Sequence, residues 1–149
     1  MAVLFLDTSA LVRRYFQPEA DANRVRQVCT PSQGHSIVVA RIAAVEVAAA
    51  LRRRLRERTL TRAGLERRWR QFDADWRNQY QVALPTEAVH MSATTLVARY
   101  PLRTLDALQL ASALAVGARV SPDAFQFWTS DEQQARAARA EGLRVELLK

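Results

Sequence analysis

Short apolar runs alternate along this chain with longer stretches of helical periodicity. The short runs are rich in β-branched and aromatic residues, which favour strands. They lie at Ala2–Leu6, Ser36–Val39, Gln81–Leu84, Phe125–Trp128 and Leu143–Leu147. Strands separated by helices pair in parallel through right-handed crossovers. We therefore expect one α/β domain over residues 1–149, a three-layer α/β/α sandwich around a central parallel sheet of four or five strands.

Helical patterns fill the segments between these runs. They cover Ser9–Phe16, Glu19–Cys29, Ala43–Arg58, 61–80, 86–99, Thr104–Val116 and Asp131–Glu141. Thr61 and Thr86 are expected N-caps, and Pro18, Pro31, Pro101 and Gly142 are expected to end or separate helices. In the long helix after Thr61 an apolar stripe recurs at helical spacing: Leu65, Trp69, Phe72 and Trp76. This spacing favours packing in the core or in a dimer over base stacking.

Composition narrows the class of protein. Hydrophobic residues make up 49% of the 149 positions, enough to bury a core. The single cysteine, Cys29, excludes an internal disulfide and a zinc cluster, and we expect it to be a small buried hydrophobe. The sequence shows neither a signal peptide nor an apolar run of membrane length, so we expect no membrane association and a cytoplasmic protein.

The formal net charge is +7, and arginine supplies nearly all of the positive charge. Ten arginines stand against four acids between Arg52 and Arg77, a net charge of +6 for that segment. Such a strip attracts phosphates. It is equally typical of a solvated helix face.

Four acids occupy comparable places in the predicted fold. Asp7 ends the first strand, and Glu46 lies near the start of the helix after the second strand. Asp106 falls in the first turn of the helix that begins at Thr104, its expected cap, and Asp131 follows the fourth strand. Because strand ends and helix starts meet at the same edge of a parallel sheet, we expect one cleft to collect all four acids.

Taken singly, these acids have ordinary explanations. Asp106 and Asp131 sit where acids cap a helix or favour its dipole. Glu46 has apolar neighbours, so we expect this stretch to be largely buried, where a lone carboxylate is costly. Four carboxylates in one cleft repel each other, and a divalent cation is the natural compensation.

Oxygen ligands alone favour Mg²⁺, or Mn²⁺, over zinc. Neither His35 nor His90 has a partner at the spacing of a zinc site, and we expect structural or surface roles for both. An acidic site that holds divalent ions suits phosphodiester hydrolysis, because the metal lowers the pKa of a bound water and stabilises the leaving oxygen.

Four segments in order resemble the PIN-domain nucleases, and most closely the VapC-type toxins of bacterial toxin–antitoxin modules. The segments are Leu4–Val12, Ala43–Leu51, Arg103–Ala113 and Phe127–Asp131, and a closing helix, glycine and strand follow over Ala135–Leu147. The resemblance implies a metal-dependent endoribonuclease that hydrolyses RNA.

The resemblance also implies residue roles. It makes Asp7 and Asp106 the main Mg²⁺ ligands, with Glu46 and Asp131 completing the metal shell or helping to deprotonate the attacking water. Four hydroxyls would then bind metal waters or phosphate oxygens, or serve as ordinary turn and cap groups: Thr8, Ser9, Thr129 and Ser130.

Similar proteins form homodimers and are silenced by a cognate antitoxin whose C-terminal segment reaches the acidic cleft. One departure from the family pattern concerns the second motif, which often has a serine or threonine shortly before the glutamate. Here the run Ala40–Val45 has none, so we expect a hydroxyl that supports Glu46 to be absent.

Other phosphoryl-transfer families fit less well. Haloacid-dehalogenase-like phosphatases and response-regulator receiver domains use a lysine near the acidic site, and the only lysine here is Lys149. The sequence has no glycine-rich phosphate loop. Two alternatives remain: a non-toxin PIN-like nuclease acting on structured RNA or DNA, and a non-catalytic RNA-binding or assembly module of the same fold.

Overall fold

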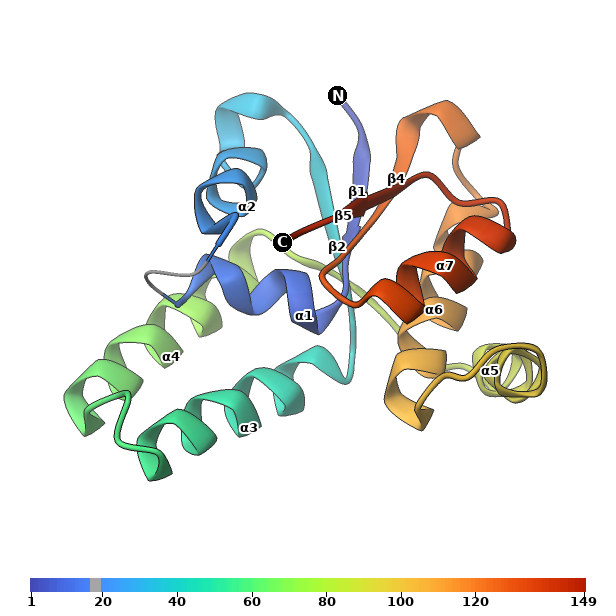
Figure 1. Ribbon diagram of the computed structural model, residues 1–149. Coiled ribbons are helices and arrows are strands. Elements are labelled where there is room, and N and C mark those ends of the chain that lie inside the picture. The colour runs from blue at the N-terminus through green and yellow to red at the C-terminus, as the bar shows by residue number, and fades with distance from the viewer. Residues whose placement is uncertain (17–19) are drawn as a thin grey trace.

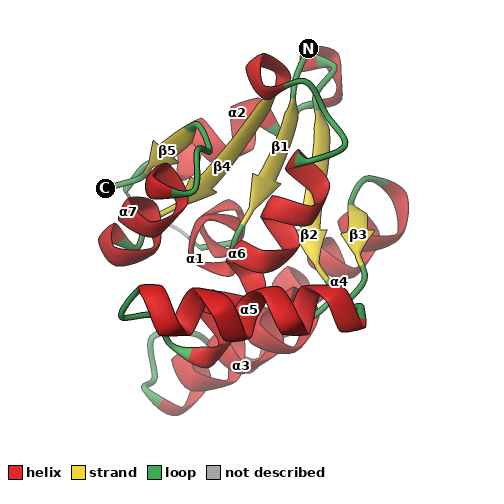
Figure 2. Cartoon of the chain, turned by 90° about the vertical axis from the view of Figure 1, so that its right-hand side faces the viewer, coloured by secondary structure: helices red, strands yellow, loops and turns green. Residues whose placement is uncertain are grey.

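All five expected strands join one parallel sheet in the computed structural model, which describes residues 1–16 and 20–149. The strands are β1 (Val3–Leu6), β2 (Ser36–Ala40), β3 (Gln81–Ala83), β4 (Phe125–Thr129) and β5 (Val145–Leu147). Their order across the sheet is β3-β2-β1-β4-β5 (Figure 2). The predicted fold class is confirmed, with five strands rather than four.

Seven α-helices connect the described strands. They are α1 (Thr8–Leu11), α2 (Ala22–Val28), α3 (Ala43–Arg56), α4 (Arg62–Asn78), α5 (Glu87–Arg99), α6 (Thr104–Gly117) and α7 (Glu132–Ala140). Short 3₁₀ turns cover Val12–Arg14, Pro31–Gln33 and Pro122–Ala124. The helix expected over Ser9–Phe16 is thus one α-helical turn followed by a 3₁₀ turn, a tightening common at the ends of short helices. The predicted helix start at Glu19 and the break at Pro18 lie outside the described residues.

Helix caps test the sequence predictions directly. The hydroxyls of Thr61 and Thr86 accept hydrogen bonds from backbone N–H groups three residues on, at 3.0 and 3.2 Å, which confirms both caps. Thr104 was expected to cap α6, and this prediction is wrong. Thr104 is already the first helical residue, and the extended residue before it, Arg103, makes no side-chain cap. A cap requires an extended backbone, which Thr104 does not have.

Helices cover both faces of the sheet, as Figure 1 shows. Because side chains alternate along a strand, Leu4 and Leu6 belong to the core on the α1–α4 side, whereas Phe5 belongs to the core on the α5–α7 side. Cys29 is fully buried in the first core, as expected. None of the described helices combines the length and apolar character that a membrane crossing needs.

The apolar stripe of α4 packs into the same first core. Leu65 and Phe72 are buried there, and Trp76 packs against them while partly exposed. Trp69 is 36% exposed, with its ring centroid 5.3 Å from that of Phe72. Core packing of the stripe is confirmed.

The strand order reverses between β1 and β4. From β1 the chain moves outward through β2 to β3, then returns to place β4 on the other side of β1. The backbone N–H of Asp7 donates to the carbonyl of Trp128 at 3.1 Å, so the two strand ends stay together. Parallel α/β sheets bind ligands at such a switch point, beyond the carboxyl ends of the strands.

Candidate functional site

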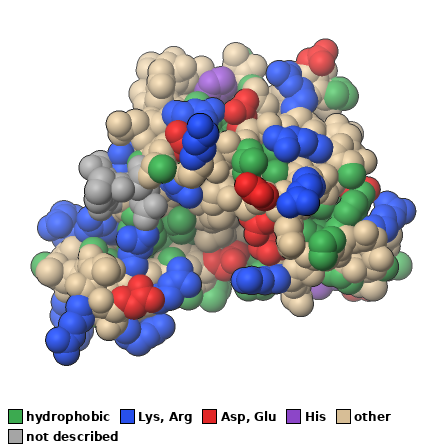
Figure 3. Space-filling view, in the orientation of Figure 1, with side chains coloured by type: hydrophobic (Ala, Val, Ile, Leu, Met, Phe, Trp, Pro, Cys, Tyr) green, Lys and Arg blue, Asp and Glu red, His purple; other side chains and the backbone are tan. Residues whose placement is uncertain are grey.

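The four predicted acids line one cleft of about 540 Å³ at this switch point. Asp7 follows β1, Glu46 lies in the first turn of α3, Asp106 in the first turn of α6, and Asp131 precedes α7. In Figure 3, acidic side chains gather near the middle of the face, with arginines around them. The structure therefore brings together four residues that lie up to 124 positions apart in the chain.

Asp7 is the most buried of the four, at 2% exposed. Its Oδ1 accepts hydrogen bonds from Ser9 Oγ at 2.6 Å and from the Ala10 N–H at 2.9 Å, and Thr129 Oγ1 donates to its Oδ2 at 2.6 Å. Burial raises the pKa of Asp7 from 3.8 to about 6, although these three hydrogen bonds lower it. The hydrogen bonds thus fix the position of the Asp7 carboxyl group, while its burial disfavours the ionised form.

Asp131 makes local hydrogen bonds through both its side chain and its backbone. Its Oδ1 caps α7 by accepting from the Gln134 N–H at 3.0 Å, which agrees with its expected position at a helix start. Its own N–H donates to Thr129 Oγ1 at 3.1 Å, so the hydroxyl that holds Asp7 also holds this turn.

Asp106 shares the cleft with two other acids. Burial raises its pKa, and the negative charges of Asp131 and Glu46 raise it further, while the nearby Arg103 lowers it. Its backbone carbonyl accepts from Gln134 Nε2 at 3.1 Å, which ties α6 to α7. The mutual repulsion of these carboxylates is the electrostatic feature that a bound cation would relieve.

Glu46 is only half-buried, so the expectation of a largely buried stretch is wrong. Its neighbour Val45 is 69% exposed, and Glu46 itself lines the cleft. Glu46 Oε1 accepts from Thr8 Oγ1 at 2.8 Å and from Gln109 Nε2 at 2.9 Å. The second motif has no hydroxyl to support Glu46, as expected. Thr8, which lies outside that motif, supplies one instead.

The hydroxyls near the acids act mainly on the carboxylates. Thr8, Ser9 and Thr129 each donate to an acid of the cleft. Ser130 contributes its backbone N–H, which donates to Ser9 Oγ at 2.9 Å. These residues orient the acids before any ligand binds.

Sequence reasoning missed two glutamines of this cleft, Gln109 and Gln134. Both are almost fully buried, at 2% and 1% exposed, and both bind cleft segments through their amides. The available signal was a polar residue inside an apolar helical run, most plainly in Leu108-Gln109-Leu110. A buried amide needs a partner, and so indicates a polar site.

Arginines contribute to the wall of the cleft. Arg53 and Arg56 reach it from α3, and Arg103 from the turn before α6, all three exposed. Part of the predicted basic strip therefore belongs to the site, while much of its remainder is exposed on α3 and α4.

No three histidine, cysteine, aspartate or glutamate side chains in residues 1–16 and 20–149 lie close enough together to hold a metal ion as they stand. The donor chemistry of the cleft nevertheless fits a hard divalent cation. Its four acids offer only oxygen ligands, and their charges repel each other at Asp106.

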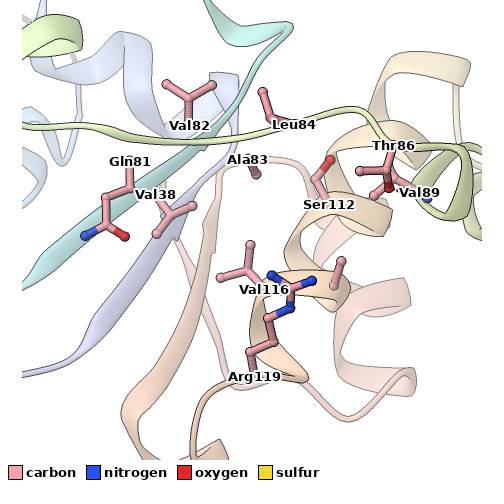
Figure 4. Close-up of a pocket in the computed structure, with 11 residues that line it drawn as sticks. Val38, Gln81, Val82, Ala83, Leu84, Thr86, Val89, Ser112, Val116 and Arg119 are labelled. Atoms are coloured by element: carbon pink, nitrogen blue, oxygen red, sulfur yellow. Dashed lines mark hydrogen bonds between the residues drawn. The ribbon is translucent and has the colours of Figure 1, made fainter.

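A second hollow of about 400 Å³ lies beside the edge strand β3 (Figure 4). Aliphatic side chains of β2, β3, α5 and α6 line it together with a few polar residues, among them Arg119, which follows α6. No acid is among its described lining residues. It therefore lacks the groups needed for metal-assisted hydrolysis, and the acidic cleft is the candidate site.

Solved structures share the whole architecture. The chain resembles VapBC2 from Rickettsia felis, in a complex with a promoter DNA fragment, with a TM-score of 0.67, 12% identity and 99% of each chain covered. It also resembles a DNA-bound VapBC from Salmonella typhimurium, with a TM-score of 0.63, 15% identity and 98% of each chain covered.

A third similar structure is VapC20 from Mycobacterium tuberculosis, described as a sarcin-ricin loop cleaving toxin. Its TM-score is 0.64 at 17% identity, with 94% of this chain and 95% of that chain covered. A comparison with curated proteins finds no match.

The family model of the PIN domain matches residues 4–140, which include β1 from its second residue onward, all of β4 and all four acids of the cleft. PIN-domain proteins are generally nucleases that use divalent metal ions. The match spans most of the 149 residues, and the parallel sheet and the cleft at its switch point agree with it. This chain belongs to the PIN-domain family.

Proposed function

We propose that this protein is the toxin of a toxin–antitoxin module and acts as a Mg²⁺-dependent endoribonuclease in which Mn²⁺ can replace Mg²⁺. The observation that carries the proposal is the convergence of Asp7, Glu46, Asp106 and Asp131 on one arginine-lined cleft. The sarcin-ricin loop cleaving activity in the description of VapC20 supports RNA as the substrate class.

In this proposal Asp7 and Asp106 hold the cation, and Glu46 and Asp131 complete its shell. The bound ion supplies an activated water and charge stabilisation for the leaving oxygen. Glu46 Oε2 makes no hydrogen bond with a described residue, so it is free to accept a proton from the attacking water. Arg53, Arg56 and Arg103 bind the phosphates on either side of the scissile bond.

The metal requirement is the first test. Purified protein should cleave RNA with Mg²⁺, lose cleavage in EDTA and regain it with excess Mg²⁺, because the ion supplies the activated water and stabilises the leaving oxygen. Cleavage is measured on matched single-stranded RNA, structured RNA and DNA. Activity that survives EDTA would overturn the metal mechanism. Cleavage confined to DNA would favour the alternative nuclease, and absence of both ion binding and cleavage would favour a binding module.

The toxin role requires a partner. We propose a cognate antitoxin, as in the VapBC structures similar to this chain. We also propose a homodimer as the working form, as the resemblance to the VapC-type toxins implies. A net charge of +7 suits both RNA and an acidic antitoxin segment.

Expression in a bacterial host tests the toxin role. Growth should arrest on induction and recover when the product of an adjacent small gene is co-expressed. Asp106→Asn should not arrest growth, because it removes one of the two proposed main ligands. Arrest by this variant at equal expression would separate toxicity from cleavage and contradict the proposal.

A further inference from the structure

Gln109 is a polar residue in the most apolar part of α6. It lies one turn after Asp106, on the same helix, and is 2% exposed among buried alanines and leucines. A leucine or methionine at this position would satisfy the core without a hydrogen-bonding requirement. The amide therefore needs an explanation beyond packing.

Both N–H groups of this amide are used. Gln109 Nε2 donates to Thr8 Oγ1 and to Glu46 Oε1, each at 2.9 Å. The Thr8 hydroxyl donates to the same Glu46 oxygen at 2.8 Å. Gln109 thus links α6 to α1 and α3, and one carboxylate oxygen receives two hydrogen bonds.

The other end of the amide has no partner. Gln109 Oε1 is the only buried side-chain nitrogen or oxygen in the described part of the chain without a hydrogen bond. An unpaired buried acceptor costs about 1–3 kcal/mol. Rotating the amide by half a turn would not help, because its oxygen would then face the Glu46 carboxylate. The orientation that leaves Gln109 Oε1 unpaired is therefore the one that lets Gln109 Nε2 donate to Glu46.

We propose that Gln109 is the positioning residue for Glu46, a role that rests on the proposed metal-dependent cleavage. Together with Thr8 it fixes Glu46 Oε1 and so leaves Oε2 available for the cation or the attacking water. Because Asp106 and Gln109 stand one turn apart on α6, one helix carries a proposed ligand and the group that orients a second ligand.

Mn²⁺ binding by calorimetry tests this role without RNA. Gln109→Met keeps the length of the side chain and removes the donors, so Mn²⁺ should bind about 10–100-fold more weakly. The thermal stability of the metal-free protein should hold or rise, because the unpaired oxygen is gone. In cleavage assays the Mn²⁺ concentration for half-maximal rate should rise similarly, while the KM for RNA stays constant.

Ser112→Ala is the matched control, since Ser112 is a buried polar residue of the same helix that donates only to the Leu108 carbonyl. It should leave Mn²⁺ affinity unchanged. Thr8→Val is the second variant, because Thr8 donates to the same oxygen of Glu46. In the double variant Thr8→Val/Gln109→Met, the loss of Mn²⁺ binding free energy should be smaller than the sum of the losses in the two single variants.

The outcomes separate the two proposals. If the wild type neither binds Mn²⁺ nor cleaves RNA, the proposed function fails. If the wild type does both and Gln109→Met and Thr8→Val bind Mn²⁺ as tightly as it does, the positioning role is overturned and the function stands. If Gln109→Met does not fold, Gln109→Leu takes its place: tenfold weaker Mn²⁺ binding supports the role, and unchanged binding overturns it.

Discussion

Asp7→Asn should abolish RNA cleavage while the protein remains folded. The substitution removes the charge of a proposed main ligand, and the loss of one charge-stabilising group in an active site costs about 10²–10³-fold or more in rate. The amide keeps the shape of the side chain, and the hydroxyl of Thr129 is able to accept from it in place of donating. Initial rates on a fixed RNA substrate, compared at equal protein concentration, measure the effect.

The same variant should be more stable than the metal-free wild type at neutral pH. The folded pKa of Asp7, about 6, lies above its ordinary value of 3.8, so the folded state binds the proton more tightly. Wild-type stability therefore rises as the pH falls from about 6 to about 4. Asparagine does not titrate, and its advantage should be largest above pH 6, up to about 3 kcal/mol, and should disappear near pH 4.

Asp123→Asn provides the matched control for both measurements. Asp123 is exposed, and its carboxylate makes no hydrogen bond with a described residue. The control should keep wild-type cleavage and lack the gain in stability above pH 6. Wild-type cleavage by Asp7→Asn, or its unfolding at pH 7, would contradict the assignment of Asp7.

Among the substitutions proposed for this protein, Phe72→Ala should cause the largest loss in the free energy of unfolding. Phe72 is 1% exposed, and its ring contacts four aromatic rings at centroid distances of 5.3–6.2 Å: Tyr15, Trp69, Trp76 and Tyr80. Removing a buried phenylalanine costs about 3–5 kcal/mol through lost transfer energy and the cavity left behind. The melting temperature should fall by on the order of 10 °C.

Trp69→Ala tests whether burial is the cause. Trp69 belongs to the same helix and cluster but is 36% exposed, so its removal should cost clearly less. Both variants should cleave RNA normally well below their melting temperatures, because neither residue lines the acidic cleft. Equal melting temperatures for the two variants would contradict this account of the core.

Much of the fold follows from local pattern. The five apolar runs became the five strands, and Thr61 and Thr86 cap helices because a hydroxyl next to a helix start has an N–H within reach. Predictions from local pattern were wrong where the surrounding structure sets the conformation or the burial of a residue. Thr104 was expected to cap a helix, but the extended residue before that helix is Arg103. Glu46 was expected in a largely buried stretch, but it lines the cleft and is half-buried.

The candidate site divides in the same way. Its acids were predictable because carboxylates at strand ends and helix starts share one edge of a parallel sheet. The groups that orient them were not all predictable, because Gln109 and Thr8 are 101 positions apart and meet only when α6 packs against the sheet.

The succession of strands and helices along the chain and the four candidate acids could be predicted from periodicity and residue type. The folded arrangement sets which carboxylate oxygens of those acids are held by hydrogen bonds and which are not. That outcome depends on hydrogen bonds between segments far apart in the chain, as in the two donors that converge on Glu46 Oε1. Directional contacts of this kind have no periodic signature in a sequence.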